Sequence, residues 1–105
     1  MKCIVFTYGT LLDDTIRYDV LGYHTSVYPA YLCGFEIREI SFGQVSYPVI
    51  VEVSNSKSVI KGRYFEIRKS DLIKLDLYET NAYERIRVKL DKSVEAWVYI
   101  KASGK

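Results

Sequence analysis

The chain has 105 residues, about the length of one domain, of which 49% are hydrophobic and 27% charged. This composition is typical of a globular protein and excludes a disordered tail. The 15 basic and 13 acidic residues leave a net charge of +2 and are spread along the chain, so no basic block indicates nucleic-acid or membrane-surface binding.

The first quarter of the chain predicts a strand, a tight turn and a short helix. Residues 2–8 alternate in polarity and are rich in β-branched side chains, and the strand that they predict stops at Gly9. Asp13 or Asp14 is expected to cap the next helix. Gly22 is expected to end it, in the place where a left-handed cap is commonly needed.

Three further strands are predicted in the middle of the chain. Residues 30–40 predict one strand, with Gly34 as a bulge or a point of close backbone approach. Residues 47–53 predict the second, with a proline near its start, where the missing amide does least harm. After a polar loop, residues 59–67 predict the third, which contains Gly62.

The last third of the chain predicts one helix and two strands. Ser70 is expected to cap a helix over residues 70–79, and the strands cover 83–90 and 94–101. The whole chain thus has about six strands and two short helices, too little helix for a doubly wound fold. We expect one α+β domain over residues 1–105, in which a compact antiparallel or mixed sheet closes towards a barrel.

Glu79 is the first candidate catalytic residue in the sequence. At about 100° per residue it falls on the same side of the predicted helix as Leu72 and Leu75, so a carboxylate points towards the core. Burial and the negative end of the helix dipole both raise the pKa of such a group, as a general acid/base near neutral pH requires. The alternative is that the helix ends earlier and Glu79 faces water or pairs with Arg85 or Arg87.

Asp76 is a second inward carboxylate, which we expect to form a hydrogen bond with a tyrosine or a backbone amide.

The turn after the first strand is the second candidate functional feature of the sequence. Glycine there allows successive amides, ahead of a helix start, to converge on a carboxylate or a developing oxyanion. Taken alone, such a turn is usually only a connection.

The sequence offers few residues for a Cys/His zinc site or a Ser-His-Asp catalytic triad. Cys3 and Cys33 match no metal-ligand spacing, and His24 is the single histidine. We expect no metal and no cofactor, and both cysteines reduced in the core. Because no signal peptide and no run of about 18 apolar residues is present, we also expect a cytoplasmic protein with no membrane partner.

The segments, taken in order, resemble the γ-glutamyl cyclotransferase-like family, also called AIG2-like. Three blocks at compatible spacing carry the resemblance, which covers nearly the whole chain. They match the family's Tyr-Gly-(Thr or Ser)-Leu loop, its Tyr-Pro-aliphatic segment, and its Gly-x-x-Tyr, Leu-Asp-x-(aromatic)-Glu and Tyr-x-Arg series. In this sequence the blocks are Tyr8-Gly9-Thr10-Leu11, Tyr47-Pro48-Val49-Ile50, and Gly62 to Phe65, Leu75 to Glu79 and Tyr83 to Arg85.

The resemblance implies the family's compact β-barrel-like α+β fold and its reaction, in which a γ-glutamyl amine or amino acid cyclises to 5-oxoproline and releases the amine. It implies that Glu79 is the catalytic acid/base, with no cofactor and a small γ-glutamyl compound as partner. Substrate contacts are expected from the loop amides and from pocket side chains, each of which can equally be structural. These residues are Tyr8, Gly9, Thr10, Leu11, Tyr47, Tyr83 and Arg85.

One departure from the family pattern affects the substrate. Many members have glycine directly after the glutamate, whereas this chain has Thr80. The nearest alternative is a non-catalytic carboxylate-binding protein or another amide-processing member of the fold. A small β-barrel nucleic-acid binder that stacks tyrosines and uses arginines on phosphates is the alternative from another class. We expect a monomer or a homodimer that binds no nucleic acid.

Overall fold

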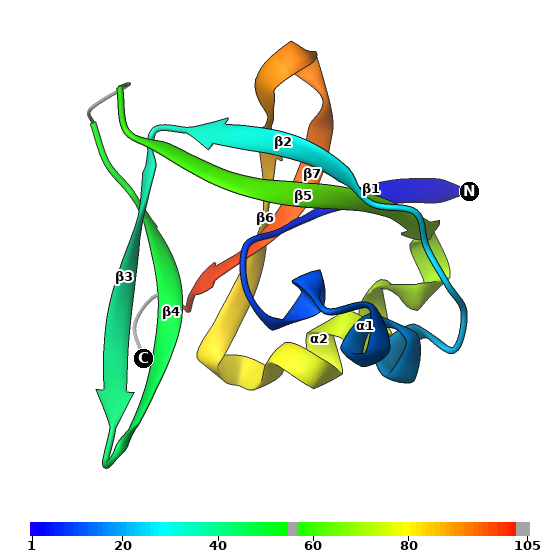
Figure 1. The fold of residues 1–105 in the computed structure, drawn as a ribbon, viewed down its shortest axis with the longest axis horizontal. Helices are drawn as coiled ribbons and strands as arrows, with labels where there is room; N and C mark the ends of the chain where they lie inside the picture. Colours follow the sequence, from blue (N-terminus) through cyan, green and yellow to red (C-terminus); the bar gives the residue numbers. More distant parts are fainter. Residues whose placement is uncertain (55–56, 103–105) are drawn as a thin grey trace.

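The computed structural model describes residues 1–54 and 57–102, which form a mixed α+β structure (Figure 1). Within these ranges there are seven β-strands and two α-helices. The strands are β1 (Lys2–Thr7), β2 (Tyr28–Cys33), β3 (Phe35–Phe42), β4 (Val45–Glu52), β5 (Val59–Arg68), β6 (Tyr83–Lys89) and β7 (Glu95–Lys101). The helices are α1 (Asp14–Leu21) and α2 (Leu72–Glu79). The predicted α+β class is confirmed.

Five of the strands form one mixed sheet in the order β2-β5-β1-β7-β6, and β3 and β4 form a separate antiparallel pair. The central strand β1 runs antiparallel to β5 and parallel to β7, so that Val5 lies between Phe65 and Trp97. Within the described residues no strand ladder joins the two sheets. The mixed sheet is therefore as predicted, but it does not close into a barrel.

The core lies on both faces of the five-stranded sheet, because side chains alternate along a strand. Val5 packs with Leu21 and Leu75 on the face that the two helices cover. Its neighbour Phe6 packs on the opposite face, where Ile50 of the β3–β4 hairpin completes the core. The end of β1 consequently lies where the helices, the sheet and the hairpin meet (Figure 1).

Helix α1 has both predicted ends. The Asp13 carboxylate accepts hydrogen bonds from the amides of Thr15 and Ile16 at 2.8 and 3.1 Å, which satisfies donors that the first turn leaves free. Gly22 follows the last helical residue with a φ of 87°, a left-handed conformation that favours glycine. The local signals at this helix therefore sufficed to place it.

The single strand predicted over residues 30–40 is in fact two strands. Gly34 has a φ of 82°, and its amide donates to the Ser58 carbonyl while its own carbonyl accepts from Val53. The chain turns at this glycine, so that β2 stays on β5 whereas β3 leaves to pair with β4. This split accounts for seven strands where about six were predicted.

Two local predictions were wrong. Ser70 does not cap α2, because residues 69–71 form a 3-10 turn and the helix begins only after Asp71. Cys33 is exposed and not in the core, since its neighbour Leu32 takes the inward position on β2. Cys3 is half-buried, and both thiols are free as predicted.

Candidate active site

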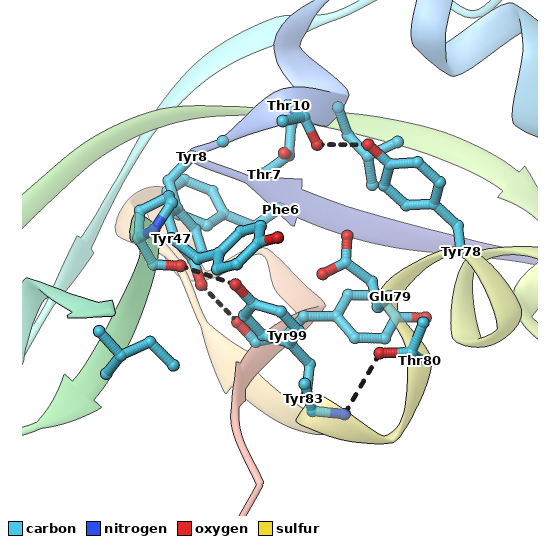
Figure 2. Close-up of a pocket in the computed structure, with 15 residues that line it drawn as sticks. Phe6, Thr7, Tyr8, Thr10, Tyr47, Tyr78, Glu79, Thr80, Tyr83 and Tyr99 are labelled. Carbon is cyan, nitrogen blue, oxygen red and sulfur yellow. Dashed lines mark hydrogen bonds between the residues drawn. The ribbon is translucent and has the colours of Figure 1, made fainter. Parts of the chain in front are cut away.

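A cavity of about 510 Å³ lies between the end of β1, the end of α2 and the β3–β4 hairpin (Figure 2). It therefore joins the two features that the sequence singled out, which are 68 or more residues apart in the chain. The residues around it are mostly aromatic or apolar. They are Phe6, Thr7, Tyr8, Gly9, Thr10, Leu11, Ile40, Tyr47, Pro48, Tyr78, Glu79, Thr80, Ala82, Tyr83 and Tyr99.

Glu79 is the last residue of α2, and its carboxylate points into the cavity (Figure 2). Among the described residues the carboxylate has no hydrogen-bond or ion-pair partner, and Arg85 pairs with Asp76 instead. Burial raises the pKa of Glu79 from its ordinary value of 4.5 to about 7. The helix continues to Glu79, so the inward orientation agrees with the geometry expected from the sequence.

Thr80 turns the chain sharply after Glu79. Its φ of 65° and ψ of −176° belong to a region that is almost restricted to glycine, and a β-branched residue there is strained. Its amide still donates to the Asp76 carbonyl, so the conformation is fixed by the helix end. The departure from the family's glycine therefore carries a backbone cost at the residue that follows the carboxylate.

The loop after β1 lines the cavity through Gly9, Thr10 and Leu11. Residues 10–12 form a 3-10 turn, closed by the amides of Leu12 and Asp13, which donate to the carbonyls of Gly9 and Thr10. The amides of Gly9, Thr10 and Leu11 are not consumed in closing this turn, as is usual at a helix start. Gly9 has a φ of −129°, so the turn does not depend on the left-handed region.

Arg17 is a residue that the sequence analysis missed. It is only 3% exposed, and its guanidinium donates to the carbonyls of Leu11 and Leu12 at 2.9 and 3.2 Å and to the Thr25 hydroxyl at 2.9 Å. It also pairs with Asp14. Arg17 thus holds two carbonyls of the loop that lines the cavity.

The signal for Arg17 was present in the sequence. At about 100° per residue, Arg17 falls between Val20 and Leu21 on the inward side of α1. An arginine in an apolar stripe must pair its charge inside the protein, and carbonyls at a nearby chain turn are suitable acceptors.

Most tyrosines of the cavity use their hydroxyl groups within the protein (Figure 2). Tyr8 donates to the Tyr99 carbonyl at 2.8 Å, and Tyr83 donates to the Pro48 carbonyl at 2.9 Å. Burial chiefly raises the pKa of both hydroxyls, so they stay protonated. These tyrosines present ring surfaces to the cavity and fix the hairpin against the sheet.

Tyr78 and Tyr99 were also missed as cavity residues. The Tyr78 hydroxyl lies 2.6 Å from the Thr10 hydroxyl and connects the end of α2 to the loop. The Tyr99 hydroxyl donates to Asp76 at 2.6 Å, as the sequence led us to expect for an inward aspartate. Tyr47, by contrast, was expected at the site and does line the cavity.

Arg85 lies outside the cavity, although the sequence analysis placed it among the substrate contacts. Its guanidinium makes two hydrogen bonds to Asp76, at 2.9 and 3.1 Å, and stacks over the Trp97 ring at 4.4 Å. The hydrogen bonds to Asp76 raise the pKa of Arg85. Burial alone would raise the pKa of Asp76, but the hydrogen bonds from Arg85 and Tyr99 outweigh burial and lower that pKa. The Asp76–Arg85 pair connects α2 to β6.

Neither a cluster of metal-ligand side chains nor a membrane-spanning helix is found in the described part of the chain. Over residues 1–54 and 57–102, no three histidine, cysteine or acidic side chains are grouped as metal ligands. None of the described helices is long and apolar enough to cross a bilayer.

Several solved structures share this fold. A protein of Arabidopsis thaliana matches with a TM-score of 0.81 and 27% identity, over 96% of this chain and 62% of that one, so the present chain spans less than two thirds of its length. A gamma-glutamyl cyclotransferase matches with a TM-score of 0.77 and 20% identity, over 97% of this chain and 68% of that one. A gamma-glutamyl cyclotransferase from yeast that is specific to glutathione gives 0.73 and 13%, over 98% and 70%.

The sequence itself carries the family assignment. No curated protein matches it. The family model described as "Gamma-glutamyl cyclotransferase, AIG2-like" matches residues 5–105, a range that includes the loop after β1, the hairpin and α2 with Glu79. The chain therefore belongs to the gamma-glutamyl cyclotransferase, AIG2-like family.

Proposed function

We propose that this protein is a cyclotransferase that closes the glutamyl part of a γ-glutamyl compound to 5-oxoproline and releases the amine. The observation that carries the proposal is the Glu79 carboxylate, which is half-buried without a partner among the described residues, in a cavity that the loop of residues 9–11 also lines. A carboxyl group with a pKa of about 7 is populated in both protonation states near neutral pH, as proton transfer in both directions requires.

The reaction needs one proton acceptor that later becomes a donor. Ionised Glu79 takes a proton from the substrate's α-ammonium group, and the freed amine attacks the γ-carbonyl carbon. The new carbon–nitrogen bond closes a five-membered ring and leaves a tetrahedral oxyanion. When this intermediate collapses, protonated Glu79 gives its proton to the departing nitrogen, and the original amide bond breaks. The ring nitrogen still carries one proton too many and loses it through Glu79 to the released amine, so that Glu79 is ionised again. Attack within one molecule gains greatly from correct positioning, so little further chemistry is demanded of the protein.

The loop after β1 is the proposed binding element for the glutamyl group. The amides of Gly9, Thr10 and Leu11 are suited to the α-carboxylate or to the oxyanion, because main-chain donors held in a fixed turn need no reorganisation. Arg17 keeps the turn in place through the carbonyls on its far side. Tyr8, Tyr47 and Tyr83 are proposed to enclose the extended substrate.

The direct test is to incubate the protein with a panel of γ-glutamyl amines and γ-glutamyl amino acids and to quantify 5-oxoproline. Glu79→Gln keeps the shape of the side chain but cannot transfer the proton, so product formation should fall at least a hundredfold, as for loss of a general acid/base. Glu95→Gln, at an exposed position on β7, is the matched control. Undiminished turnover by Glu79→Gln would contradict the proposed mechanism.

The same panel separates the proposed reaction from simple binding. A protein that forms no 5-oxoproline from any compound, yet is stabilised against heat by a γ-glutamyl compound, would be a binding protein with the same cavity. Stabilisation that is lost on replacing the substrate's α-carboxylate with an amide would place recognition at that carboxylate.

A further inference from the structure

Strand β6 lies at one edge of the five-stranded sheet, and among the described strands it pairs with β7 alone. Two main-chain hydrogen bonds flank this pair: the Ala102 amide donates to the Ala82 carbonyl at 3.1 Å, and the Leu90 amide to the Val94 carbonyl at 2.7 Å. Both extend the β6–β7 register, in which bonded and non-bonded residues alternate. The even-numbered residues of β6 therefore bond to β7, and the odd-numbered residues direct their amides and carbonyls to the open edge.

The outward-directed main-chain groups include those of Arg85, Arg87 and Lys89, none of which lines the cavity. Unpaired amides and carbonyls along a strand edge are a template for another strand. The three side chains lie on one face of the sheet, because side chains alternate along a strand. Trp97 lies opposite Arg87 in the register and shares that face. An added strand would therefore meet main-chain hydrogen-bonding groups together with a row of cations.

Arg87 is the central cation of this row. It is exposed and has no ion-pair partner in the described part of the chain, whereas Arg85 is bonded to Asp76. The Arg87 guanidinium lies 4.7 Å from the centroid of the Trp97 ring. Because this stacking already restrains the guanidinium, less side-chain freedom is lost when an anion binds. Arg87 is thus a preorganised partner for a carboxylate.

A second copy of the chain is a poor partner for this edge. Antiparallel pairing of β6 with itself places a cation opposite a cation in every register that overlaps residues 85–89. Like charges directly opposite each other are destabilising, and charged side chains commonly keep natural edges from pairing with themselves. The same cations favour a strand that carries acidic side chains at the facing positions.

We propose that the free edge of β6 binds an extended acidic segment of a partner protein as an added antiparallel strand. Main-chain hydrogen bonds to Arg85, Arg87 and Lys89 give affinity, and a carboxylate opposite Arg87 gives specificity. Ile86 and Val88 lie on the other face of β6, half-buried against the core, so apolar residues suit the intervening positions. The recognised segment is one in which acidic and apolar residues alternate.

A short peptide provides the first test. In acetyl-Ser-Glu-Val-Glu-Val-Thr-Ser-amide the central glutamate is placed opposite Arg87, and threonine faces Arg85, which Asp76 already neutralises. Binding is measured by calorimetry and by the fluorescence of Trp97, the only tryptophan of the chain. We expect a peptide with lysine at the central position to bind at least tenfold more weakly. Equal binding of the two peptides, or binding of neither, would overturn the proposal.

Reversing one charge on the protein tests the position of the site. We expect Arg87→Glu to bind the glutamate peptide at least tenfold more weakly than the wild type does, and to prefer the lysine peptide. Arg63→Glu makes the same change of charge at an exposed position on β5, an interior strand of the same sheet, and should alter binding less than twofold. An equal loss in both variants would show that net charge alone attracts the peptide, and would contradict a site at this edge.

Strand addition makes a further prediction about individual amides. The amides of Arg85, Arg87 and Lys89 should exchange rapidly with solvent in the free protein and at least tenfold more slowly with saturating peptide, as followed by NMR. Those of Ile86 and Val88 should be protected in both states, because they bond to β7. A peptide N-methylated at the central glutamate keeps the carboxylate but loses the main-chain donor, and should bind at least tenfold more weakly. Unchanged exchange at the three outward amides would refute strand addition.

Two other occupants of the edge give different results. Pairing between copies of the chain would produce a dimer in sedimentation at rising protein concentration, with the outward amides protected in the absence of peptide. A single-stranded oligonucleotide that competes with the peptide and binds more tightly at the same salt concentration would indicate a phosphate site. Either result would overturn the assignment of this edge to an acidic protein segment.

Discussion

Replacing Glu79 with glutamine is expected to stabilise the fold, and to do so mainly above neutral pH. Folding raises the pKa of this carboxyl group from 4.5 to about 7 through burial. Between these values the native protein holds a proton that the unfolded chain releases. The free energy of unfolding therefore falls as the pH rises through this interval, and the penalty is complete above about pH 7. Glutamine carries no charge in the folded or the unfolded state, so the variant does not lose stability as the pH rises through this interval.

The size of the effect follows from the pKa. Each tenfold change in proton affinity is worth about 1.4 kcal/mol, so this rise has a ceiling of about 3 kcal/mol. The side chain is half-buried, and screening by solvent reduces the expected gain to about 2 kcal/mol at pH 8. For a domain of this length, a gain of that size raises Tm by about 8 to 15 °C.

The measurement is denaturant unfolding of the wild type and of Glu79→Gln at pH 5 and pH 8. Only the difference between the two proteins is interpreted, because other carboxyl groups titrate equally in both. Glu95→Gln controls for the loss of one exposed carboxylate. A variant whose advantage is as large at pH 5 as at pH 8, or which is no more stable at pH 8, would refute the picture of an unpaired buried carboxylate.

Three other substitutions test the elements that support the cavity. Gly62→Ala should destabilise the protein by about 2 kcal/mol or more in denaturant unfolding, because the added Cβ would lie 2.5 Å from the Thr7 carbonyl oxygen. Thr80→Gly should raise the free energy of unfolding by about 1 kcal/mol, since glycine adopts its positive φ without strain. Arg17→Met should raise KM for any accepted substrate about tenfold and lower Tm by several degrees, because the buried carbonyls of Leu11 and its neighbour lose their donor.

The sequence predicted best what is decided by neighbouring residues. Helix α1 was placed at both ends because Asp13 and Gly22 act locally, on amides two or three residues away and on one φ angle. The inward direction of Glu79 followed from helical periodicity, which holds once the helix extends that far. These features need no knowledge of the rest of the molecule.

Features set by long-range contacts were predicted less well. Gly34 was recognised as unusual, but whether it bulges a strand or ends it depends on the pairing of β3 with β4, which the local sequence does not contain. Arg85 was assigned to the substrate because the family pattern includes an arginine there. Its actual partner is Asp76, nine residues earlier, and that pairing depends on how β6 packs against α2.

The two unfavourable features at the end of α2 are adjacent, and together they argue for a functional origin. Glu79 is an unpaired, half-buried carboxylate at the negative end of a helix, and Thr80 holds a conformation that suits glycine. Their costs differ in kind, however. Glycine at position 80 can keep the same φ and ψ, so Thr80→Gly should remove strain and leave the carboxylate aimed at the cavity. Glu79→Gln should also stabilise the fold, yet abolish proton transfer. Stability gained at position 80 with turnover retained, and gained at position 79 with turnover lost, would assign the chemistry to the carboxylate and not to the strained turn.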